Sequence, residues 1–87
     1  MQYLFRIRRV YFDQIKAGTK TTEYRAAIGS YRWLERVATN AEIRFQCGPY
    51  LSLTKIIDSV EKIETPEEFR DADWCRGCSE VYAIHLK

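Results

Sequence analysis

Residues 17–25 read AGTKTTEYR: an amphipathic segment stops at a glycine, and three charged side chains follow within six positions. Gly18 can adopt the positive φ that ends a helix, and the paired threonines after the turn favour a strand. Because side chains alternate along a strand, Thr21, Glu23 and Arg25 are expected on one face of it. The stretch therefore predicts a helix, a tight turn and a strand with one strongly polar face.

The charged side chains of this stretch suit the binding of an anion. Lys20 and Arg25 can hold a phosphate, while Glu23 can accept a hydrogen bond from a base or fix the arginine. The alternative is an ordinary solvated face that binds nothing. We predict that the three residues line a common concave site.

Hydrophobic periodicity predicts a mixed chain of helices and strands around the stretch. A strand is expected over residues 3–8, and a helix carrying Tyr11, Phe12 and Ile15 precedes Gly18. Ser30 is expected to cap a second helix, which carries Trp33, Leu34 and Val37 and ends near Asn40. A third strand is expected over residues 43–47, followed by a turn at Gly48-Pro49.

The second half of the chain continues the same pattern. Residues 51–63 are long for one strand and change their inward phase, so a bulge is expected near Lys55. Thr65 followed by Pro66 and Glu68 predicts a capped helix start, and residues 81–86 alternate as a last strand. Five strands with short helices in 87 residues favour an α+β fold with a small, closed or half-closed β-barrel.

Composition predicts one domain over residues 1–87. The chain is 46% hydrophobic and 14% aromatic, which is enough for one modest core, and it has no repeat or flexible linker. No apolar run approaches the roughly 20 residues of a membrane helix. The N-terminus does not resemble a signal peptide, because residues 5–9 alternate apolar and cationic side chains instead of forming a continuous apolar region. Three cysteines, an odd number, favour a reducing compartment. We therefore expect a cytoplasmic protein without a membrane partner.

Charge is distributed unevenly along the chain. Residues 1–36 hold eight basic and three acidic residues, a balance of +5, and residues 37–87 hold six basic and nine acidic residues, a balance of −3. Such asymmetry indicates one face that attracts phosphate and another that repels it. The alternative is that these charges lie on solvated faces without a partner.

The motif at Gly18, Lys20, Glu23 and Arg25 resembles the G-x-K-x-x-E-x-R signature of ASCH domains, which belong to the PUA-like superfamily. The signature follows a first short helix, as here, and the order of the other expected elements agrees along the whole chain. One departure is the pair Asn40-Ala41, where many members have Gly-Asp before a strand. The resemblance implies a small PUA-like β-barrel that binds RNA or a nucleotide-like small molecule.

Whether the chain is an enzyme depends on one position. Some proteins similar in this motif are amidohydrolases of N4-acetylcytidine, with a lysine, a threonine nucleophile three residues later and a distant glutamate. Lys20 matches that lysine, but Glu23 occupies the position of the nucleophile. Thr21, on the same face, lies about 6 to 7 Å away along the strand, too far for the same geometry. A small hydrolase of a modified nucleoside or RNA, with Lys20 and Glu23 as catalytic candidates, therefore remains the alternative.

Cysteine and histidine give only weak indications of chemistry. Cys75 and Cys78 have the spacing of metal ligands, and Cys47 and His85 are possible third and fourth ligands. The alternative is two thiols in a loop, and no metal or other cofactor is expected. No serine or cysteine lies near His85 in sequence, so no nucleophilic triad is predicted.

Several aromatic residues lie near turns or basic positions, where a ring can stack on a base. Trp33 is expected in the core, and Trp74 and Tyr50 are the better stacking candidates. We therefore predict an RNA- or nucleotide-binding module, and a protein-interaction adaptor that uses the acidic half is a further alternative. The predicted ligand-binding residues are Lys20, Glu23, Arg25, Arg8, Thr21, Trp74 and Tyr50.

Overall fold

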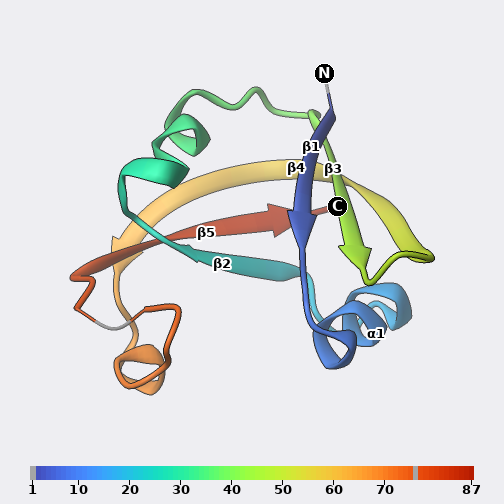
Figure 1. Ribbon diagram of the computed structural model, residues 1–87. Coiled ribbons are helices and arrows are strands. Elements are labelled where there is room, and N and C mark those ends of the chain that lie inside the picture. The colour runs from blue at the N-terminus through green and yellow to red at the C-terminus, as the bar shows by residue number, and fades with distance from the viewer. Residues whose placement is uncertain (1, 76) are drawn as a thin grey trace.

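The computed structural model describes residues 2–75 and 77–87 and contains a five-stranded sheet with short helices (Figure 1). The strands are β1 (Gln2–Arg6), β2 (Thr22–Ala26), β3 (Glu42–Cys47), β4 (Leu51–Glu64) and β5 (Glu80–Leu86). The helices are the α-helix α1 (Arg9–Ala17) and the 3₁₀ helices η1 (Gly29–Arg36) and η2 (Glu67–Phe69). No helix in these residues is long and apolar enough to cross a membrane.

The sheet is mixed, and its strand order is β1-β3-β4-β5-β2. β1 runs parallel to β3, and the other neighbours are antiparallel. The long strand β4 pairs with β3 through its first part and with β5 through its second part, and it bends as it passes between them (Figure 1). The sheet therefore curls into a half-barrel, which confirms the expected α+β fold with a small, half-closed β-barrel.

One face of the curled sheet holds the main core. Phe5, Phe45 and Ile84 are fully or almost fully buried in this core. Ile15 of α1 and Leu34 of η1 pack against these strand residues and are buried with them. This arrangement follows from the sequence, because the apolar positions of each strand alternate and those of α1 recur at helical spacing.

The last strand is buried on both faces. Val81 and Ala83 are as inaccessible as Tyr82 and Ile84, so the opposite face of β5 is also covered. On that opposite face the Tyr24 ring packs against Phe69, with ring centroids 4.9 Å apart. The expected alternation of a half-exposed strand is therefore absent from β5.

The helix and turn before β2 form as expected. Gly18 takes a left-handed conformation with φ of 84°, and its amide donates to carbonyl oxygens of the last turn of α1. Asn40, the residue that stands where the resembling sequences have glycine, also has a positive φ of 73°. Asparagine tolerates this conformation better than most residues, so the departure from the Gly-Asp pair leaves a left-handed turn in place.

Some expectations about secondary structure were wrong in detail. The second helix is a 3₁₀ helix that ends at Arg36, and Ser30 does not cap it, because its N-cap is Ile28 with no side-chain hydrogen bond. β1 ends at Arg6 instead of residue 8. The irregularity in β4 lies between Ile57 and Ser59, beyond Lys55, because the pairing with β5 begins there.

The helix predicted from Thr65 is only the three-residue turn η2. Thr65 does not cap it: its hydroxyl donates to the Cys78 carbonyl oxygen at 2.8 Å. The threonine is buried, so its hydroxyl satisfies a long-range contact in place of the local cap.

Candidate ligand site around Lys20, Glu23 and Arg25

The three charged residues of the motif come together in the structure. Glu23 pairs with Ile84 of β5, and Arg25 pairs with Tyr82, so both side chains project from the core face of the sheet. Lys20 precedes β2, and its amide donates to the Gln14 carbonyl oxygen at 3.1 Å. The helix end therefore fixes where the lysine enters the site.

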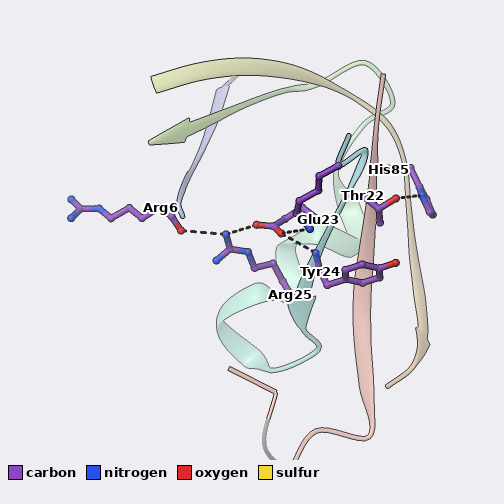
Figure 2. A network of polar contacts seen from close by, with 7 residues as sticks. Arg6, Thr22, Glu23, Tyr24, Arg25 and His85 are labelled. Carbon is purple, nitrogen blue, oxygen red and sulfur yellow. Dashed lines mark hydrogen bonds and ion pairs between the residues drawn. The ribbon is translucent and has the colours of Figure 1, made fainter. Parts of the chain in front are cut away.

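Glu23 lies between the two cations and pairs with both. Its Oε2 is 2.9 Å from Arg25 Nη2, and its Oε1 is 3.5 Å from Lys20 Nζ. Only 10% of the Glu23 side chain is exposed, against 17% for each partner. Figure 2 shows the Glu23 carboxylate facing the Arg25 guanidinium. We call these three residues the charged cluster.

Arg25 is held by more than its ion pair. Its guanidinium carbon lies 4.3 Å from the centroid of the Phe5 ring and 5.8 Å from that of Tyr31. Its Nη2 also donates to the Arg6 carbonyl oxygen at 3.3 Å, so the arginine connects the two edge strands (Figure 2). Its Nε is buried and has no hydrogen-bond partner among the described residues.

Lys20 lies between two aromatic rings at the edge of the cluster. Its Nζ is 5.5 Å from the ring centroid of Tyr11 and 5.6 Å from that of Tyr24. The Tyr24 amide donates to Glu23 Oε1 at 3.2 Å, which helps to orient the carboxylate. Cation–π contacts of this kind hold a flexible lysine in place without neutralising it.

The cluster carries two positive charges and one negative charge. Its net positive charge and its remaining donors suit an oxyanion or the oxygen-rich edge of a base. The Glu23 carboxylate supplies an acceptor beside them. This arrangement brings together the three residues that the sequence predicted to act jointly, and their role in binding a ligand stays a prediction.

The other predicted site residues lie around or away from the cluster. Arg8 is exposed and directly precedes α1, and Thr21 is exposed and directly precedes β2. Tyr50 is 92% exposed in the turn between β3 and β4. Trp74 is 43% exposed, and its ring centroid is 5.3 Å from that of Phe69. Trp33 packs against the core, as expected, and stacks on Tyr3.

The cysteines and the histidine do not form a metal site. Within residues 2–75 and 77–87, no group of three or more cysteine, histidine, aspartate or glutamate side chains is arranged to hold a metal ion. All three cysteines are free thiols, and buried Cys75 contacts the hydroxyl of Thr65. A hollow of about 420 Å³ lies beside this contact and shares no residue with the charged cluster; it is lined by Glu64, Thr65, Arg70, Gly77, Cys78 and Ser79.

Sequence reasoning missed the aromatic surroundings of the cluster and a polar contact between buried Tyr82 and exposed Glu35. Tyr82 donates from its phenol to Glu35 Oε2 at 2.6 Å. Burial, and then the hydrogen bond to Glu35, raises the pKa of Tyr82 to about 12, and the same hydrogen bond together with Lys62 lowers the pKa of Glu35. Alternation placed Tyr82 inward, but nothing in the sequence paired it with Glu35.

Two solved structures resemble this chain over nearly its whole length. The crystal structure of a serine-to-alanine mutant of the ZmASCH protein from Zymomonas mobilis has a TM-score of 0.73 and 16% identity, and the match covers 99% of this chain and 67% of that one. The crystal structure of the hypothetical protein PH0355 has a TM-score of 0.70 and 17% identity, with 100% and 98% covered. No protein-family model and no curated protein matches the chain. The likeness in structure shows that this chain has the fold of an ASCH domain.

Proposed function

We propose that this protein is an ASCH-type module that binds RNA or a nucleotide-like small molecule at the charged cluster. In this proposal Lys20 and Arg25 hold a phosphate. Glu23 orients the arginine and accepts a hydrogen bond from a base. Arg8 and Thr21 extend the contact along the chain on either side of α1.

The observation that carries the proposal is the buried Nε of Arg25, which has no hydrogen-bond partner among the described residues. An unsatisfied buried donor costs on the order of 1 to 3 kcal/mol, and more when the group is charged. A ligand oxygen or an ordered water bound there removes this cost. The stacked Phe5 ring and the Glu23 carboxylate keep the guanidinium oriented for such a partner.

The amidohydrolase alternative has less support. Glu23, at the position of the threonine nucleophile, is engaged in two ion pairs. The hydroxyl of half-buried Thr22 contacts His85, on the face of β2 opposite the cluster. We also propose that the protein is cytoplasmic. Free thiols, such as its three cysteines, are typical of proteins in this reducing compartment, where RNA is also present.

Titration with short labelled oligoribonucleotides tests this function. Affinity should fall as salt rises, because contacts to phosphate release counterions. Lys20→Ala and Arg25→Ala should each weaken binding by about 1 to 3 kcal/mol, the range for losing a charge-assisted hydrogen bond.

Lys62→Ala is the matched control, because it removes the same charge from an exposed ion pair with Glu35, which is not part of the cluster. It should change binding much less than Lys20→Ala does. Equal losses in the two variants would show only a general charge effect. Absence of binding by the wild-type protein at low salt would reject the proposal.

A further inference from the structure

A second polar cluster lies on the face of the sheet opposite the charged cluster. Thr22, His85 and Glu61 come from the neighbouring strands β2, β5 and β4. The Thr22 hydroxyl oxygen is 3.2 Å from His85 Nδ1, and His85 Nε2 is 2.9 Å from Glu61 Oε2. Figure 2 shows the contact of Thr22 with His85. Both ring nitrogens of the only histidine in the chain are thus engaged.

The order of these groups fixes the positions of the protons. An ionised carboxylate only accepts hydrogen bonds, so His85 Nε2 carries a hydrogen and donates it to Glu61. In the neutral ring Nδ1 is then the acceptor, and the Thr22 hydroxyl donates to it. A hydroxyl bound to an imidazole that is oriented by a carboxylate is the arrangement that activates a nucleophile.

The backbone around Thr22 supplies a further donor. The Leu86 amide donates to the Thr21 carbonyl oxygen at 2.8 Å, so Thr22 and His85 form a non-hydrogen-bonded pair of the antiparallel ladder. In such a pair the side chains lie close, and the Thr22 amide points away from β5. Because β2 is an edge strand, this amide faces the open edge of the sheet, where it can stabilise an oxyanion next to the hydroxyl.

The site is open to small molecules. Side-chain exposure is 36% for His85 and 60% for Glu61, and Thr22 is half-buried. We propose that Thr22, His85 and Glu61 form an acyl-transfer centre that hydrolyses small carboxylic esters. This activity is separate from the proposed ligand binding, and neither requires the other.

The reaction needs only an ester and water. The Thr22 oxygen attacks the ester carbonyl carbon while His85 Nδ1 takes the hydroxyl proton, and that proton passes to the departing alcohol as the acyl C–O bond breaks. Water then attacks the acyl-threonine, giving its proton to His85. The carboxylic acid leaves, and Thr22 recovers its proton. Glu61 is a positioning residue that keeps His85 in the required tautomer.

Hydrolysis of p-nitrophenyl acetate by the whole chain tests the proposal. Thr22→Val keeps a β-branched side chain in the strand and should lower the rate at least about tenfold, as should His85→Gln. Thr22→Ser should retain activity, and Thr54→Val, at an exposed threonine of β4 outside both polar clusters, should match the wild type. Glu61→Ala should lower kcat with KM unchanged. Glu61→Gln should restore part of the lost kcat, because the glutamine amide oxygen still accepts a hydrogen bond from His85 Nε2.

Peptide mapping by mass spectrometry after brief reaction should find the acetyl group on Thr22. Acetyl groups found only on lysines, or equal rates for the wild type and Thr22→Val, would overturn the proposal. Circular dichroism checks that each variant is folded. If Thr22→Val does not fold, the comparison of Thr22→Ser with His85→Gln decides the question, and equal rates in these two variants would overturn the proposal as well.

Discussion

The guanidinium carbon of Arg25 lies 4.3 Å from the centroid of the Phe5 ring. This contact joins the end of β2 to a core residue of β1. Arg25 also bonds the Arg6 carbonyl oxygen. Two edge strands that share no ladder are thus held together by one planar side chain. Arginine suits this position because its flat group can stack and donate in its own plane at the same time.

Arg25→Lys should destabilise the fold although it keeps the charge. An ammonium group cannot both lie flat on Phe5 and reach Glu23 and the Arg6 carbonyl oxygen. The expected loss is about 1 to 2 kcal/mol, from one stacked cation and one hydrogen bond. Urea unfolding measures it, with Arg9→Lys as control, because the Arg9 pair with Asp13 is exposed. Equal effects of the two substitutions would contradict the role given to the stack.

Glu23→Gln should destabilise the fold more strongly. It leaves Lys20 and Arg25, each 17% exposed, as neighbouring cations without their shared counter-charge. Removing one partner of a buried pair costs about 3 kcal/mol or more. Asp13→Asn, which breaks the exposed pair with Arg9, should cost less than about 1 kcal/mol. The two free energies of unfolding, measured side by side, check the difference.

Gly18→Ala should cost about 1 to 2 kcal/mol, because φ is 84° at this position and an L side chain is strained there. No atom within 4 Å would meet the new Cβ, so the cost is one of backbone conformation. Gly29 has equally open surroundings without the positive φ, and Gly29→Ala should be neutral or slightly stabilising. Thermal unfolding of both variants tests this, and similar shifts in Tm would contradict it.

Stability should fall as pH rises from about 10 to about 12. The pKa of Tyr82 is raised from 10.0 to about 12, first by burial and then by the hydrogen bond to Glu35. The unfolded chain therefore loses this proton at a lower pH than the folded chain does. The stabilisation is complete below pH 10 and is lost as pH rises through the folded value. Denaturant unfolding across this range measures the slope.

Tyr82→Phe should reduce that slope, because it removes the group whose pKa differs between the two states. Tyr50→Phe, at a tyrosine that is 92% exposed, should leave the slope unchanged. An unaltered slope in Tyr82→Phe would show that other groups cause the dependence on pH.

The local parts of the fold could be predicted because their causes lie within a few residues. Gly18 ends α1 through its own conformation, and the alternation of Ile43 and Phe45 marks β3. The charged cluster was predictable for the same reason, since its three members lie within six positions. Where a local signal competed with a distant partner, prediction failed. Thr65 reads as a helix cap, but its hydroxyl bonds Cys78.

The sequence by itself determined the strands, α1, the turn at Gly18 and the nearness of Lys20 to Glu23 and Arg25, because backbone conformation and side-chain alternation set these. Only the tertiary structure placed Phe5 beneath Arg25 and Thr22 beside His85, 63 positions apart. Those contacts depend on β5 lying between β4 and β2 and on the curl that brings β1 near β2. Strand order and curl are set by packing of the whole core, which no short stretch of sequence contains.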